Sequence, residues 1–133
     1  MNAMQAYAQP GSAPYSQIGR LARLLSLPPE ENLDSIGLAK RVAAGLPTDA
    51  VDVLCDLLGR KEIVGPVVPE ATLRRARKNG NPLPQEYSER IYALSRVVDA
   101  LARVYHGDFE KMRRFLTGPH MLLRMETPLD LAR

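Results

Sequence analysis

The chain has 133 residues, enough for one domain with a hydrophobic core, and its 45% hydrophobic and 25% charged residues are ordinary for a globular protein. No run approaches the ~18 consecutive apolar residues of a membrane-spanning helix, and the N-terminus lacks a secretory signal, so we expect a cytoplasmic protein with no membrane partner. The net charge of +3 is unevenly distributed: residues 1–70 carry 6 Lys/Arg and 8 Asp/Glu, whereas residues 71–133 carry 12 Lys/Arg and 7 Asp/Glu. This excess of positive charge in the second half indicates either an anionic partner or a surface that serves solubility alone.

The first half of the chain predicts short helices separated by Gly and Pro. Residues 1–16 have no charge and no periodicity and are predicted to be a disordered arm. Three helices follow. The first carries Ile18, Leu21, Leu24 and Leu25 and ends at Pro28; the second is capped by Asn32 or Asp34 and carries Ile36, Ala39 and Val42; the third is capped by Thr48 and carries Val51, Leu54, Cys55 and Leu58. The apolar residues in 18–25 and 36–42 exceed what one small domain needs, which predicts a homodimer.

The second half contains the strongest helix signal. A short helix is expected over about 60–67, and a basic helix then opens at Pro69 and ends at Gly80-Asn81-Pro82. The longest helix is predicted over 84–106 from one apolar stripe, made of Ile91, Leu94, Val97, Val98, Leu101, Val104 and Tyr105. Asp99 and Arg103 are expected to pair on its outer side. A turn at residues 106–108, a helix over 109–116, a loop over 120–126 and a last turn from Thr127-Pro128 complete an all-α chain.

Catalysis finds little support in the sequence. There is no phosphate loop, nucleophile elbow or metal-ligand spacing, so we expect no enzyme, no metal and no cofactor. Cys55 is interpreted as a small buried thiol rather than a nucleophile. His106 is interpreted as a cation at a helix end rather than a general base, and His120 as a surface or interface residue.

The segment 57–83 has the layout of a helix-turn-helix unit, whose second helix enters the major groove of DNA. The predicted DNA-binding residues lie on that second helix: Thr72, Arg74, Arg75, Arg77 and Lys78. Leu73 and Ala76 are expected to face inward. The alternative is a solvated face, because Lys and Arg are favoured near a helix C-terminus in any case.

Several motifs of the chain, taken in order, resemble the Xre/MbcA/ParS-type antitoxins. The best matches are Thr72-Leu73-Arg74-Arg75, Gly80 to Leu83, Ser88-Glu89-Arg90, Val104 to Asp108, Phe115-Leu116 with Pro119, and Thr127-Pro128-Leu129-Asp130-Leu131. Gly45-Leu46-Pro47 and Leu57-Leu58-Gly59 match more loosely. Together these motifs cover about residues 35–131.

The resemblance implies an antitoxin of a type II toxin–antitoxin pair. The partner would be a RES-domain toxin that consumes NAD or transfers ADP-ribose, and the antitoxin would cover its active-site entrance. Residues 17–82 would form a helix-turn-helix-like domain for operator DNA binding and dimerisation, and residues 83–133 a toxin-binding domain. The alternative is a helical transcription regulator without a toxin partner.

The expected toxin-binding residues lie near the C-terminal end of the chain. They are Pro119, Leu122, Arg124, Met125, Thr127, Pro128, Leu129 and Arg133. Apolar side chains between two prolines in a non-helical stretch are unusual for a solvated loop and are typical of an interface. The other interpretation is that Leu122 and Leu123 fold back onto the core.

Overall fold

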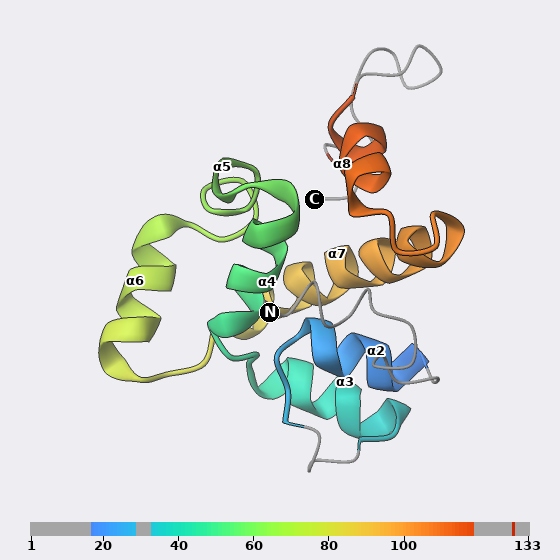
Figure 1. Ribbon diagram of the computed structural model, residues 1–133. Helices are drawn as coiled ribbons and strands as arrows, with labels where there is room; N and C mark the ends of the chain where they lie inside the picture. The colour runs from blue at the N-terminus through green and yellow to red at the C-terminus, as the bar shows by residue number, and fades with distance from the viewer. Residues whose placement is uncertain (1–16, 29–32, 119–128, 130–133) are drawn as a thin grey trace.

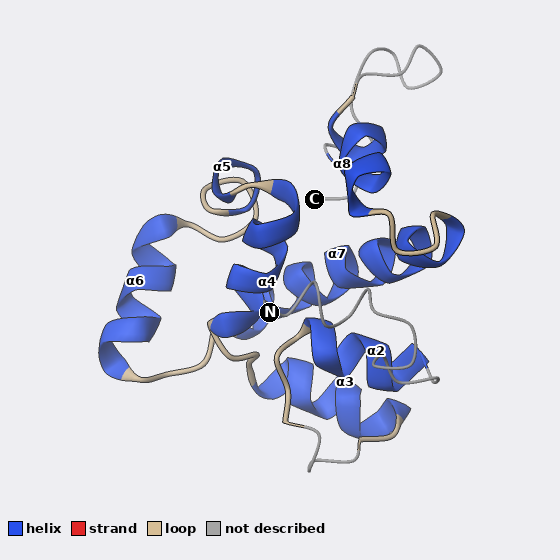
Figure 2. Cartoon of the chain, in the orientation of Figure 1, coloured by secondary structure: helices blue, strands red, loops and turns tan. Residues whose placement is uncertain are grey.

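The computed structural model describes residues 17–28, 33–118 and 129 of the chain. Within these ranges it has seven helices and no strand, apart from one isolated bridge between Val64 and Val68 (Figure 2). The helices are α2 (Gln17–Leu24), α3 (Ser35–Ala44), α4 (Asp49–Leu58), α5 (Arg60–Ile63), α6 (Glu70–Asn79), α7 (Gln85–Val104) and α8 (Phe109–Thr117) (Figure 1). The predicted all-α class is confirmed for this part of the chain. The predicted arm over 1–16 and the loop over 120–126 lie outside it.

Local signals explain where most helices begin and end. The Asp34 carboxylate accepts a hydrogen bond of 2.7 Å from the amide of Gly37, and Asp108 caps α8 in the same way through the amide of Lys111. Pro69 and Pro84 each stand immediately before the first residue of a helix. Thr48 occupies the predicted N-cap position of α4, but its side chain makes no capping hydrogen bond.

Three predicted helices are shorter in the structure. The first, expected to end at Pro28, ends at Leu24, and Ser26 just beyond it has a φ of 57°. The helix expected over 60–67 ends at Ile63, because Gly65 takes a positive φ of 112° and the chain turns back through Val67 and Val68. α7 is the longest described helix, with 20 residues, but it ends at Val104 rather than 106. His106 has a φ of 53°, and the amide of Gly107 closes the helix end by donating to the carbonyl of Ala102.

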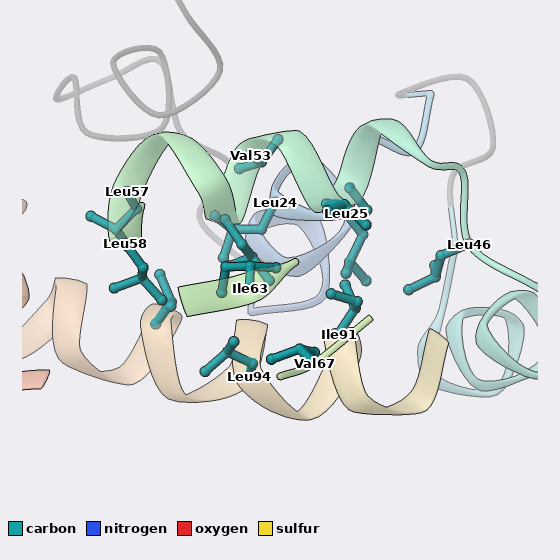
Figure 3. Packing of buried hydrophobic residues seen from close by; sticks show 14 of the residues in the cluster. Leu24, Leu25, Leu46, Val53, Leu57, Leu58, Ile63, Val67, Ile91 and Leu94 are labelled. Carbon is teal, nitrogen blue, oxygen red and sulfur yellow. The ribbon is translucent and has the colours of Figure 1, made fainter. Parts of the chain in front are cut away.

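One hydrophobic core joins the helices. It includes Leu24 of α2 with Leu25 just after it, Leu57 and Leu58 of α4, and Ile91 and Leu94 of α7, as Figure 3 shows. α7 packs against α2, α3, α4 and α8. Residues from both sides of the predicted boundary at 82/83 therefore share a single core.

The buried side of α7 differs from the prediction. Ser88, Ser95, Asp99 and Ala102 are buried, whereas Val104 at the end of the predicted stripe is 67% exposed. Asp99 is 1% exposed and does not pair with Arg103. It accepts hydrogen bonds of 2.8 and 3.4 Å from the Arg20 guanidinium of α2. The expected outer ion pair is therefore wrong, because α2 covers that side of the helix.

The apolar residues of α2 and α3 are largely used inside one copy of the chain. Leu21, Leu24, Leu25, Leu38 and Val42 are all buried in the core. Ile36 and Ala39 face outward instead of sharing the buried face with Val42, and Ile36 is 66% exposed. The apolar surplus that suggested a homodimer is thus mostly accounted for by the fold. No helix in the described ranges is long and apolar enough to cross a membrane.

Candidate nucleic-acid interface

The basic helix α6 is amphipathic: one narrow apolar side is buried, and most of its exposed charges are positive. Leu73 and Ala76, three residues apart, are 2% and 7% exposed. The inward orientation predicted for both is confirmed. Gly80 ends the helix in the left-handed conformation with a φ of 65°, and the amide of Asn81 donates to the carbonyl of Ala76. The two buried side chains fix which face of α6 points outward.

Three cations occupy the face opposite Leu73 and Ala76. Arg74 and Lys78 are one turn apart and Arg75 lies beside them, and all three are exposed. None has an ion-pair partner among the residues that the structure describes. We call Arg74, Arg75 and Lys78 the basic face of α6. Thr72 is half-buried at its flank.

Arg77 is the one predicted DNA-binding cation of α6 that forms an ion pair with another helix in the described part of the chain. Its guanidinium donates to a carboxylate oxygen of Asp52 in α4 at 2.6 Å, and both side chains are partly exposed. An ion pair in such a setting contributes about 0–1 kcal/mol to stability. It does fix the direction of the Arg77 side chain, which lies beside the basic face rather than on it.

α6 forms one edge of the molecule, and α8 stands on the opposite side (Figure 1). Two open hollows flank it. The larger, of about 530 Å³, lies between α6 and the start of α4 and is lined by Arg41, Thr48, Arg77 and Asn81 among others. The smaller, of about 130 Å³, lies on the side of Thr72, Arg75 and Asn79. The two hollows share Ala76, Asn81 and Pro82 and lie around the C-terminal half of α6, where the outer face of the helix stands out as a ridge.

A buried polar contact holds the base of this ridge. The hydroxyl of Ser88 in α7 accepts from the amide of Leu46 at 2.9 Å and donates to the carbonyl of Leu83 at 3.2 Å. The amide of Leu83 in turn donates to the carbonyl of Leu46. The turn before α4 and the turn after α6 are therefore joined to each other and to α7.

Gly45 lies next to these hydrogen bonds and allows the Leu83 backbone to come close. It has a φ of 115°, and a Cβ atom there would lie 2.6 Å from the carbonyl oxygen of Leu83. Only glycine allows this approach without displacing the backbone. The matched motifs around residues 45–47, 80–83 and 88–90, which are far apart in the sequence, thus meet at one place.

The last described helix is docked on α4. The Arg113 guanidinium donates to the carbonyl of Leu57 at 2.6 Å and to that of Asp56 at 3.3 Å. These carbonyls belong to the last turn of α4, where a cation is favoured by the helix dipole. Met112 and Leu116 of α8 are fully buried beside it. α8 is therefore held both by packing and by hydrogen bonds.

Leu129 is the only predicted toxin-binding residue in the described part of the chain. It is 1% exposed and belongs to the hydrophobic core, so its side chain is not the exposed apolar anchor that we expected. The core of the chain therefore already buries the apolar surface of Leu129. The remaining predicted toxin-binding residues lie outside the described residues: Pro119, Leu122, Arg124, Met125, Thr127, Pro128 and Arg133.

The cysteine and the histidines singled out in the sequence differ in surroundings. Cys55 is half-buried rather than fully buried. Burial and the nearby Asp52 carboxylate raise the pKa of its thiol, which opposes formation of a nucleophilic thiolate. His106 is exposed just beyond the end of α7. His120 lies outside the described residues.

Four residues around α6 were missed by the sequence reasoning. Asp52, Arg41 and Thr48 come from α4, α3 and the turn between them and meet α6 only in the folded chain, whereas Asn81 lies in the turn directly after α6. No spacing signal could have found Asp52, which lies 25 residues from Arg77. No model of a known protein family matches this chain, and no curated protein matches it. The family resemblance therefore rests on the motif residues themselves.

Proposed function

We propose that the chain is an antitoxin that neutralises a RES-domain toxin and represses its own operon by binding DNA as a homodimer. The observation that carries the proposal is the meeting of the Gly45-Leu46, Leu83 and Ser88 contacts at one buried place. These contacts bring together three of the motifs from which the resemblance was drawn, around residues 45–47, 80–83 and 88–90. Their gathering supports the resemblance drawn from the order of the motifs.

The DNA-binding part of the proposal rests on the basic face of α6. Three outward cations on a ridge match the shape and charge of a major groove about 12 Å wide. Arginine and lysine there would contact phosphates and base edges. The four-residue α5 is short for the first helix of a helix-turn-helix unit, and we propose that α4, which pairs with α6 through Asp52 and Arg77, takes over part of its role.

Replacing Arg75 and Lys78 together by alanine tests this part. We expect weaker binding to all duplexes and a salt dependence reduced by about 0.9 in log–log slope for each lost phosphate contact. The matched control is Lys40→Ala with Arg103→Ala, which removes two exposed cations from α3 and α7. If both double variants behave alike, the basic face is only a solvated surface.

The toxin-binding part rests on the C-terminal half. α7 is a continuous helix of 20 residues, and α8 is docked firmly on α4. Leu116 and Leu129, on either side of residues 119–128, are both buried in the core. We propose that the apolar and cationic residues in between, chiefly Leu122, Arg124 and Met125, cover the NAD entrance of the toxin, with Leu129 as their support.

Coexpression with the toxin tests this part. Arg124→Glu and Leu122→Asp should each release toxicity, seen as lost growth and falling cellular NAD, while DNA binding is kept. Leu129→Ala is the comparison for a folding defect, because it should lower thermal stability first. If both surface variants protect the cells fully, the neutralising surface lies elsewhere.

A regulator without a toxin is the second candidate, since the basic face of α6 supports DNA binding independently of the C-terminal half. Copurification with the product of the neighbouring reading frame separates the two: a stable complex favours the antitoxin, and its absence favours the plain regulator. Light scattering tests the dimer, because two recognition helices about 34 Å apart are needed to read a palindrome. A mass near 14.7 kDa would contradict it.

A further inference from the structure

The larger hollow beside α6 brings together polar groups from three separate segments. Arg41 comes from α3, Thr48 from the start of α4, and Arg77 and Asn81 from the end of α6 and the turn after it. Its volume of about 530 Å³ would suit a small molecule, but it is shallow and open. Sites for small molecules bury most of their ligand. A hollow of this shape suits a polymer strand that passes along it better than it suits an enclosed ligand.

The lining favours a phosphate group. Two arginines, Arg41 and Arg77, are among the residues that line the hollow, and the planar guanidinium matches the geometry of phosphate oxygens. The Thr48 hydroxyl makes no capping bond and has no hydrogen-bond partner among the described residues. A hydroxyl of this kind is a ready donor to a phosphate oxygen.

The two arginines are held in place within the fold. Arg41 donates to the carbonyl of Gly45 at 2.7 Å, which holds its guanidinium against the turn before α4. Arg77 is held at 2.6 Å by the Asp52 carboxylate. A phosphate in the hollow would compete with Asp52 for Arg77 and would also be repelled by its charge.

We propose that this hollow binds a backbone phosphate of duplex DNA, on the strand that flanks the groove entered by α6, and that Asp52 weakens this binding by competing for Arg77. The inference deepens the proposed DNA binding and depends on it. It adds Arg41 and Thr48 as phosphate-binding residues outside α6. It also makes Asp52 a residue whose removal strengthens binding, an effect that a merely structural role would not produce.

Binding of the full chain to a short random-sequence duplex over a range of salt concentrations tests the proposal. Arg41→Gln should lower the log–log salt slope by about 0.9. Lys40→Gln, the neighbouring exposed cation that does not line the hollow, should change it much less. Thr48→Val should weaken binding roughly threefold to tenfold at an unchanged slope. Asp52→Asn should tighten binding, and Asp52→Asn with Arg77→Gln should lose that gain.

The outcomes separate the two proposals. If the wild-type chain binds no duplex, DNA binding itself fails and the phosphate site fails with it. If the chain binds and depends on Arg75 and Lys78, but Thr48→Val and Asp52→Asn both match the wild type, the phosphate site alone is overturned. Thermal melting shows whether Arg41→Gln has lost its fold. If it has, the DNA binding of Thr48→Val and Asp52→Asn still tests the phosphate site. If inorganic phosphate displaces the duplex when its concentration equals that of the DNA phosphates, the site binds a free anion and the assignment to duplex DNA is overturned.

Discussion

At the scale of single residues, two glycines show how surroundings decide the importance of a position. Gly45 and Gly59 have similar backbone angles, with φ of 115° and 97° and ψ of 130° and 140°. A Cβ atom at Gly59 would meet nothing within 4 Å, whereas at Gly45 it would lie 2.6 Å from the carbonyl oxygen of Leu83. A residue with a Cβ atom would therefore have a strained backbone at both positions, but only at Gly45 would that atom also clash with a neighbouring group.

We predict that Gly59→Ala lowers the free energy of unfolding by about 1–3 kcal/mol through backbone strain alone. Gly45→Ala should cost at least about 1 kcal/mol more, because the Leu83 carbonyl must move and its hydrogen bond from Ser88 is disturbed. Urea unfolding of both variants measures the difference. Equal losses would show that the turn relaxes without resistance.

The buried pair of Arg20 and Asp99 gives a second residue-scale prediction. Arg20→Met removes the guanidinium that pairs with the Asp99 carboxylate, whose side chain is 2% exposed, so we expect a loss of about 3–5 kcal/mol. Replacing both residues by Met and Leu should recover most of that loss. Arg90→Met is the control, because its partner Glu86 is largely exposed and the change should cost less than about 1 kcal/mol. A small effect of Arg20→Met alone would contradict the prediction.

At the scale of helices, the question is what holds α8 on the rest of the molecule. Arg113 donates to two carbonyls in the last turn of α4, while the neighbouring Arg114 is exposed and its side chain makes no such contact among the described residues. The two positions carry the same side chain on the same helix. They differ only in whether they reach α4.

We predict that Arg113→Ala lowers stability by about 1–2 kcal/mol, because two carbonyls lose their donor and the end of α4 loses a favourable cation. Amide hydrogen exchange in α8 should accelerate in this variant. Arg114→Ala should leave both quantities near those of the wild type. If the two variants exchange alike, packing of Met112 and Leu116 alone holds α8.

At the scale of the whole molecule, the shared core predicts cooperative unfolding. α7 supplies Ile91, Leu94 and Val98 to a core that it shares with α2, α3, α4 and α8. Far-ultraviolet circular dichroism and tyrosine fluorescence should therefore give the same urea transition. A fragment ending at residue 82 should not fold, because its buried leucines would lose α7. Two separate transitions would instead support two independent domains.

The helix class and most helix boundaries could be predicted from the sequence, because the signals that set them are local. Asp34, Asp108, Pro69 and Pro84 act within one turn of the helix that they begin. The inward side of α6 also follows from local spacing, since Leu73 and Ala76 are three residues apart, whereas the other apolar residue of the helix, Ala71, lies on the opposite side and is exposed. The sequence by itself therefore determines which cations of α6 point outward.

Only the tertiary structure decided which groups meet across the chain. Arg20 and Asp99 are 79 residues apart, and no spacing rule relates them, so the sequence pattern predicts the wrong outer side for α7. Asp52 redirects Arg77 and Leu129 returns to the core for the same reason. Amphipathic spacing shows that a helix has an apolar side, but the position of its neighbours decides how far that side extends and which polar groups are buried with it.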